Sequence, residues 1–182
     1  PHARGVFVGG SLRVGVDSTG RGGRVDSPPP LSTGSFSLTA FVYREAAAQS
    51  APVATNLNGE RGSFAVSIDE NGMMQTTVRS GDGHESFIEG GSVLPLKTWR
   101  HVVVTADSQQ LQFYEDGKLV ASAPCAAMAA SDSDTVWFGT DANATQVWDG
   151  RIDEVALFDR ALTEEEIGAL YLTAQEEIAK SP

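Results

Sequence analysis

The sequence is poor in the residues that build disulfide, zinc or nucleic-acid-binding proteins. Its 182 residues include one cysteine, three histidines, and 13 lysines and arginines against 24 aspartates and glutamates. The lone Cys125 cannot close an internal disulfide and lacks the neighbouring thiols or imidazoles of a zinc site, so we interpret it as a small apolar filler. The net charge of −11 argues against a nucleic-acid partner, because that binding depends on clustered Lys and Arg.

Long apolar runs are also missing. No stretch approaches the roughly 20 apolar residues of a membrane-spanning helix, so we expect no membrane insertion by this domain. An apolar content of 41% and a charged content of 20% are typical of one globular domain. The sequence shows neither an initiator Met nor a signal peptide, and we expect an excised domain of a larger protein.

What the sequence does contain is β-strand patterning with strong turn signals. Residues 35–44 alternate so that Phe36 and Leu38 point inward, whereas Phe41 and Tyr43 point outward and predict an exposed aromatic face. Asn71-Gly72 and Asp116-Gly117 each interrupt two apolar runs and predict type I′ hairpin turns. Further strands are expected at 5–16, 99–106 and 136–139, with weak pairing over 87–93 and loops at 17–30 and 140–147.

The last strand and a helix form the strongest signal. Residues 151–158 alternate as a strand that places Asp153, Val155 and Leu157 on one face. Thr163 is a predicted N-cap, and Glu166 completes a capping box three residues later. Leu162 and Ile167 are spaced as a hydrophobic staple, and the apolar stripe continues to Leu170, Tyr171 and Ala174.

Four motifs carry a resemblance to a known family: Gly150-Arg-Ile-Asp-Glu-Val155, then Arg160-Ala-Leu-Thr163 with Glu166-Ile-Gly-Ala-Leu-Tyr171, and upstream Trp99-Arg-His-Val-Val-Val-Thr105 and Phe113-Tyr-Glu-Asp-Gly-Lys-Leu-Val120. They resemble the laminin-G-like, concanavalin A-like lectin-glucanase family. The resemblance implies an all-β fold, a two-sheet antiparallel jelly-roll sandwich with a short C-terminal α-helix. We expect residues 1–172 to form this domain and residues 173–182 to be a helix extension or a linker.

We expect no enzyme. Glycosidases of this fold pair carboxylates on one strand, a few residues apart, and no such run is present. Asp153 and Glu154 point to opposite faces of their strand. His101 alternates with Trp99 and Val103 and is interpreted as a satisfied strand residue rather than a base.

A structural calcium ion is the cofactor that the resemblance implies. In relatives the Asp of the Ile-Asp-Glu-Val motif serves a calcium site with backbone oxygens of the first strands, and Asp153 is the matching position. The alternative is that Asp153 accepts hydrogen bonds from backbone N–H groups or pairs with an Arg.

Carbohydrate is the leading ligand class. Sugars are held by aromatic faces with amide and carboxylate groups, and five residues are predicted to supply such a surface: Tyr43, Trp99, His101, Tyr114 and Trp148. The function we expect is a non-catalytic module of a larger extracellular, cell-surface or periplasmic protein. The alternative is a protein–protein interaction, adhesion or structural spacer module.

Overall fold

The structure is a computed structural model. It describes residues 12–14, 22–28, 30–31, 33–47, 50–130, 133 and 135–180, and for 12–14 and 176–180 it describes the backbone alone. Predictions that fall on the remaining residues, including most of the first expected strand, lie outside this description. Within the described part, no helix is long and apolar enough to cross a membrane.

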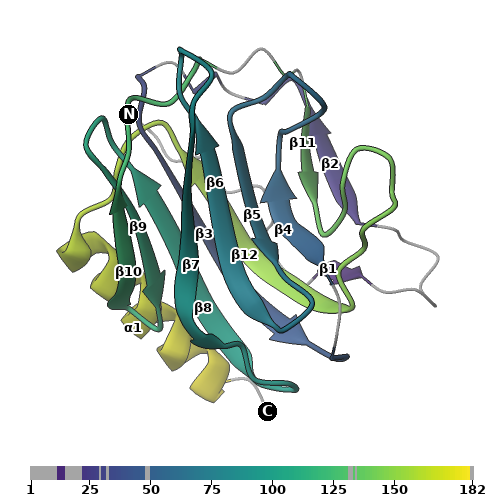
Figure 1. The fold of residues 1–182 in the computed structure, drawn as a ribbon. Helices are drawn as coiled ribbons and strands as arrows, with labels where there is room; N and C mark the ends of the chain where they lie inside the picture. Colours follow the sequence, from purple (N-terminus) through teal and green to yellow (C-terminus); the bar gives the residue numbers. More distant parts are fainter. Residues whose placement is uncertain are drawn as a thin grey trace.

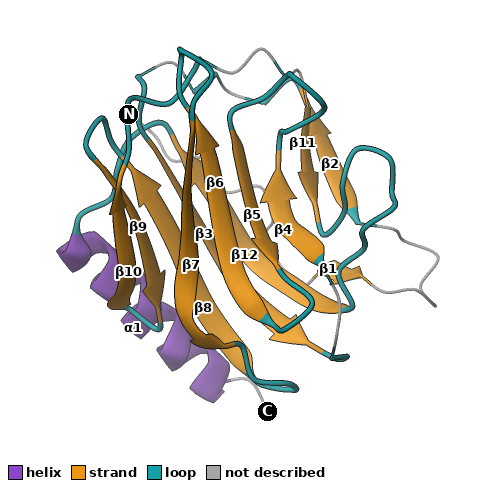
Figure 2. Cartoon of the chain, viewed as in Figure 1, coloured by secondary structure: helices purple, strands orange, loops and turns teal. Residues whose placement is uncertain are grey.

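Two antiparallel sheets face each other as a jelly-roll sandwich (Figures 1 and 2). The sheet that we call sheet A has the described strands in the order β1-β12-β3-β8-β9-β10. Their bounds are β1 Leu12–Val14, β12 Gly150–Phe158, β3 Phe36–Arg44, β8 Trp99–Ala106, β9 Gln110–Glu115 and β10 Lys118–Pro124. Among the described strands, the first, β1, pairs with the last, β12.

The second sheet, sheet B, has the described strands in the order β2-β11-β4-β5-β6-β7. Their bounds are β2 Gly23–Asp26, β11 Thr135–Phe138, β4 Ala51–Thr55, β5 Phe64–Ile68, β6 Met73–Arg79 and β7 Glu85–Val93. Strand β2 corrects the prediction of a continuous loop over 17–30. Strand β7 pairs with β6 from Glu85 to Val93, whereas the sequence predicted only weak pairing over 87–93.

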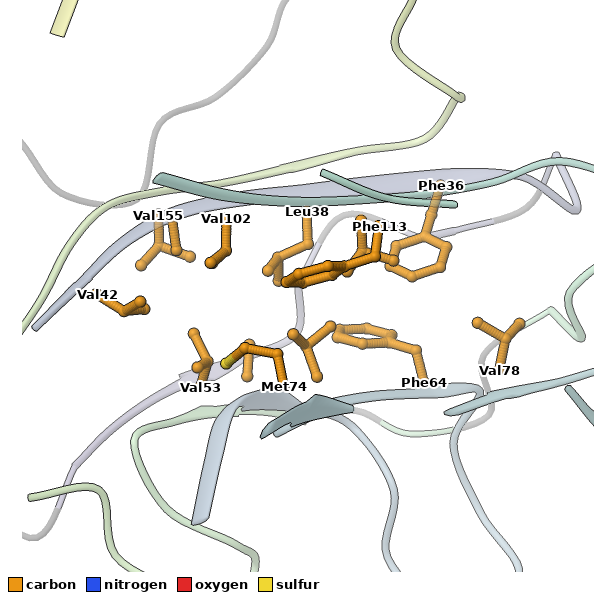
Figure 3. Packing of buried hydrophobic residues seen from close by; sticks show 14 of the residues in the cluster. Phe36, Leu38, Val42, Val53, Phe64, Met74, Val78, Val102, Phe113 and Val155 are labelled. Carbon is orange, nitrogen blue, oxygen red and sulfur yellow. The ribbon is translucent and has the colours of Figure 1, made fainter. Parts of the chain in front are cut away.

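The main core fills the space between the two sheets (Figure 3). Phe36, Leu38 and Phe113 of sheet A meet Phe64 and Met74 of sheet B, and the rings of Phe36 and Phe64 stack with centroids 5.0 Å apart. Cys125 is buried in the same cluster, as expected of an apolar filler. The removal of this apolar surface from water is the main contribution that holds the two sheets together.

Helix α1, Glu164–Lys180, lies over the outer face of sheet A. The predicted capping box is confirmed: the Thr163 N–H donates to Glu166 Oε2 at 2.9 Å, and the Glu166 N–H donates to Thr163 Oγ1 at 3.2 Å. Leu162 and Ile167, the staple pair, pack on Val103. The helix continues past residue 172 to Lys180 without a break, and whether 173–182 links to another domain stays a prediction.

The two hairpin turns differ. Asp116 and Gly117 both have positive φ (50° and 76°), so the predicted type I′ turn is confirmed there. At the other hairpin the loop spans 69–72, Gly72 has positive φ, and Asn71 is not among the positive-φ residues. Three Asp69 Oδ contacts, from the N–H groups of Asn71 and Met73 and from the Asn71 amide, hold this longer loop, so the two-residue prediction was wrong.

A β-bulge in β12 changes which residues share a face. The register shifts between Asp153 and Ala156, and Glu154 has a φ of +48°. Ile152 and Val155 therefore both enter the main core, while Asp153 lies on the opposite face from Val155. The predicted common face of Asp153 with Val155 and Leu157 is wrong, because one extra residue reverses the alternation.

Candidate functional site

The outer face of sheet A carries a row of aromatic and charged side chains beyond the residues that α1 buries. Tyr43 on β3 stands opposite Trp99 on β8 and Arg151 on β12. The Tyr43 and Trp99 rings lie 5.4 Å apart and are tilted by 52°, and the Arg151 guanidinium lies 5.1 Å from the Tyr43 ring centroid. Glu45 Oε1 is 3.6 Å from Arg151 Nε. All four side chains remain partly accessible.

Three of the five predicted ligand residues do not join this row, because they are buried. The exposed fractions are 1% for Trp148, 2% for Tyr114 and 1% for His101. Trp148 lies in the main core and donates its indole N–H to the Tyr43 carbonyl at 3.3 Å. Trp148 therefore contacts the backbone of Tyr43 from the core side of sheet A, and its ring is not accessible to a ligand.

Tyr114 belongs to the packing of α1 on the sheet. It lies in a small apolar cluster with Val103, Leu162 and Ile167, and its hydroxyl donates to Gln112 Oε1 at 3.2 Å. Burial, and to a lesser extent the charge of Glu164, raises the pKa of Tyr114 above its usual value. Its apolar environment is that of a core residue.

His101 is held between two rings. Its centroid lies 4.6 Å from that of Phe41 and 5.9 Å from that of Tyr171 on α1, and both pairs are stacked. Nε2 is 2.7 Å from Thr39 Oγ1, whereas Nδ1 is buried and has no hydrogen-bond partner among the residues that the structure describes. Burial lowers the pKa of His101 to about 4, against the opposing effect of Asp116. His101 is thus neutral near pH 7, and half of its hydrogen-bonding capacity is used.

The same finding corrects the predicted aromatic face of β3. Phe41, expected to face solvent, is buried against His101 beside α1, and Tyr43 is half-buried. The predicted strand is confirmed, but α1, which covers one end of its outer face, lies more than 100 residues later in the chain. Tyr43 and Trp99 are what remains accessible of the predicted platform.

A groove of about 490 Å³ lies between α1 and strands β3 and β12. Its lining includes Phe41, Ala156 and Phe158 from the sheet and Ala169 and Leu170 from the helix. The apolar contacts of α1 include Val103 of β8 and Tyr114 of β9, and Phe158 of β12 packs against the same cluster. Small alanines on both β12 and α1 line the groove. No motif in the sequence predicted this groove, because β3, which forms part of its sheet wall, lies more than 100 residues before α1 in the chain.

Four of the polar side chains that line the groove contact one another in pairs, while Thr173 donates to the Ala169 carbonyl at 2.9 Å and Glu154 also lines the groove. Arg160 forms two hydrogen bonds with Glu166, at 2.8 and 2.6 Å, and Thr39 contacts His101. These bonds with Arg160, and the Thr163 N–H, lower the pKa of Glu166 to about 2. Glu166 is therefore ionised at neutral pH, where it serves as an anchor for Arg160 and not as an acid.

Asp153, the predicted calcium ligand, is half-buried opposite Phe41, and its Oδ1 accepts the Glu154 N–H at 2.9 Å. This backbone contact matches the alternative expected for the residue. Across the described ranges no group of three or more His, Cys, Asp or Glu side chains is placed to hold a metal. A calcium ion would thus depend on Asp153 with backbone oxygens.

The loop after β6 brings together Ser80, Asp82 and His84, whose residue types suggest hydrolysis. Ser80 Oγ donates to Asp82 Oδ1, and His84 Nδ1 is 3.1 Å from Asp82 Oδ2. A catalytic triad needs the imidazole between serine and carboxylate, and here the carboxylate is in the middle. The trio therefore stabilises the loop, and its hydrogen bonds lower the pKa of Asp82.

Comparison with known proteins agrees with this architecture. Residues 17–168 match the family model described as the concanavalin A-like lectin/glucanases superfamily. A search of curated proteins found no match. The solved structures that are similar include the botulinum neurotoxin serotype G binding domain, with 17% identity, a TM-score of 0.62, and coverage of 77% of this chain and 36% of that chain.

Two further neighbours were solved with partners. The binding domain of botulinum neurotoxin DC in complex with SialylT shares 14% identity, a TM-score of 0.62, and coverage of 79% and 36%. The same domain in complex with rat synaptotagmin II shares 15% identity and a TM-score of 0.58, with coverage of 76% of this chain and 35% of that chain. This chain thus spans about a third of the length of these domains, and identities this low establish the fold alone.

Proposed function

Since the chain belongs to the concanavalin A-like lectin/glucanases superfamily, we propose that it is a non-catalytic binding module of a larger protein and that its ligand is carbohydrate. The observation that carries the proposal is the accessible row of Arg151, Tyr43 and Trp99, with Glu45 beside it. Aromatic surface covers the apolar faces of sugar rings, guanidinium groups donate hydrogen bonds to sugar hydroxyls, and carboxylate groups accept them. The neighbours' binding domains support a binding role of this kind.

A non-catalytic role is supported by the state of Glu166, one of the two carboxylates that line the groove. A glycosidase needs one carboxyl group that holds a proton near neutral pH and a second that is free to act. Glu166 is ionised and held by Arg160. We further propose an extracellular, cell-surface or periplasmic location, where polysaccharides and glycans are exposed.

The test is a glycan array with the 182-residue chain and three variants. Trp99→Ala and Tyr43→Ala should weaken binding of every positive glycan at least about tenfold, the equivalent of roughly 1.4 kcal/mol. Trp137→Ala is the matched control, because Trp137 is a partly buried tryptophan on β11 of sheet B, opposite Arg24. Binding lost in Trp137→Ala and kept in Trp99→Ala would move the site to the other sheet.

Protein binding is the second candidate, favoured by one edge of the sandwich. Strands β7 and β10 end their sheets, and both expose apolar side chains, among them Phe87, Val93, Leu119 and Val120. Exposed apolar edge strands invite pairing with another chain. A blank array, together with self-association or partner capture that Val120→Lys abolishes, would favour this function.

Calcium stays part of the proposal through Asp153. An ion that binds only the folded state stabilises it by RT ln(1 + [L]/Kd), so the melting temperature should fall when a chelator removes the ion. Asp153→Asn should melt at the same temperature with and without chelator. An unchanged melting temperature of the unmodified chain in chelator would remove calcium from the proposal.

A further inference from the structure

We propose that the ligand is an amphiphilic glycoside: the sugar binds at the row of Arg151, Tyr43 and Trp99, and an apolar aglycone enters the groove beside α1. This inference rests on the proposed carbohydrate binding and names the chemical class of the ligand. It starts from the position of the two surfaces relative to each other.

The groove and the row adjoin on one face of sheet A. Phe41 and His101, which line the groove, are opposite each other across β3 and β8, and Tyr43 and Trp99 form the next pair on the same face. Residues two apart on a strand are separated by about 6.8 Å. A single small molecule can therefore reach both surfaces.

The groove suits hydrocarbon better than sugar. Most of its polar side chains are already paired: Arg160 binds Glu166, Thr39 contacts His101, and Thr173 donates to the Ala169 carbonyl. The exposed residue Glu154 also lines the groove, but few donors remain for a chain of hydroxyls. The rest of the lining is mainly aromatic, aliphatic or alanine, and a volume of about 490 Å³ lies in the range of small-molecule sites. A second sugar placed there would lose hydrogen bonds to water without replacing them.

The helix presents uncovered apolar surface to this groove. Ile167 is fully buried, but Leu170, on the same predicted stripe, remains 38% exposed and lines the groove. Each methylene that leaves water for such a surface contributes about 0.8 kcal/mol, which corresponds to about fourfold in affinity. An alkyl or aryl group attached to the bound sugar would supply the missing contact.

The experiment compares methyl, butyl, hexyl and octyl β-glycosides of glucose, galactose, mannose and N-acetylglucosamine by ligand-observed NMR and calorimetry. For each sugar that binds as its methyl glycoside, the dissociation constant should fall about fourfold for each methylene that enters the groove. Octanol, which has the chain without the sugar, should bind much more weakly than the octyl glycoside.

Variants distinguish the contribution of the groove to affinity from that of the row. Leu170→Asn and Ala169→Trp should abolish the gain from chain length while leaving methyl glycoside affinity within about twofold, because they alter only the groove wall. Leu172→Asn is the matched control, because Leu172 is 62% exposed on the same helix and does not line the groove. Trp99→Ala should weaken methyl and octyl glycosides alike.

The outcomes distinguish this inference from the function beneath it. Methyl glycosides that bind with no gain from longer chains overturn the inference and leave carbohydrate binding intact. Octanol that binds as tightly as the octyl glycosides also overturns it, and so does a gain from chain length that Leu172→Asn abolishes as Leu170→Asn does. If no glycoside of any chain length binds, both the inference and the proposed function fail.

Discussion

At the scale of the residue, His101 shows how neighbours decide the role of a side chain. The sequence predicted a satisfied strand residue, and Nε2 does contact Thr39, but Nδ1 has no hydrogen-bond partner in the described part of the chain and the ring is enclosed by Phe41 and Tyr171. A buried imidazole in apolar surroundings resists protonation because the charged form loses its hydration. The consequence is a dependence of stability on pH.

We predict that acid destabilises the protein through His101. Its pKa is about 4 in the folded state and 6.5 as the ordinary value, so as pH falls the unfolded chain takes up the proton first. Stability from this group is complete above pH 6.5 and declines as pH falls toward 4. Urea unfolding should show a loss of about 2 kcal/mol between about pH 7 and pH 5.

The His101→Gln variant is the control for this pH effect. It keeps the other titrating groups, so the difference in unfolding free energy between the two proteins isolates the imidazole. Parallel pH profiles for the original chain and His101→Gln would show that His101 stays accessible to protons in the folded state.

At the scale of the element, the β9–β10 hairpin is tied to α1 through its turn. Gly117 has a φ of +76°, and a Cβ at this position would lie 3.2 Å from Tyr171 Cδ1 on the helix. The turn therefore needs glycine both for its backbone conformation and for the close approach of α1. Sequence reasoning identified the first requirement and had no means of finding the second.

We predict that Gly117→Ala costs more stability than Gly83→Ala. Gly83 also has positive φ (85°), but no described atom lies within 4 Å of its added Cβ, so that variant should cost about 1 kcal/mol from backbone strain alone. Gly117→Ala adds the displacement of Tyr171. Equal urea midpoints for the two variants would show that α1 yields freely at this contact.

At the scale of the whole molecule, the two sheets depend on one shared core. Phe36 and Phe64 stack across the sandwich, and Trp148 lies in the same cluster. No part of either sheet buries its inner face without the other. Cooperative loss of both sheets is the expected consequence.

We predict that Phe64→Ala destabilises the protein by about 3–5 kcal/mol, the usual cost of truncating a buried phenylalanine. Circular dichroism of the strands and tryptophan fluorescence should shift together to lower urea. Phe87→Ala is the control, since Phe87 is exposed on β7 and should change the stability by less than about 0.5 kcal/mol. Two separate transitions would mean that the sheets unfold independently.

The sequence by itself determined most strands, the Asp116-Gly117 turn and the capping box of α1, because these follow from local periodicity and from contacts a few residues apart. Its motifs implied the fold class through their resemblance to the concanavalin A-like family. Tertiary structure decided the accessible site. Periodicity assigns a side chain to a face of a strand, but not what covers that face, so Trp148 and Tyr114 became core residues while Tyr43 and Trp99 stayed accessible. The bulge at Glu154 and the groove beside α1 likewise depend on how distant segments pack, and packing of that kind leaves no periodic signal in the chain.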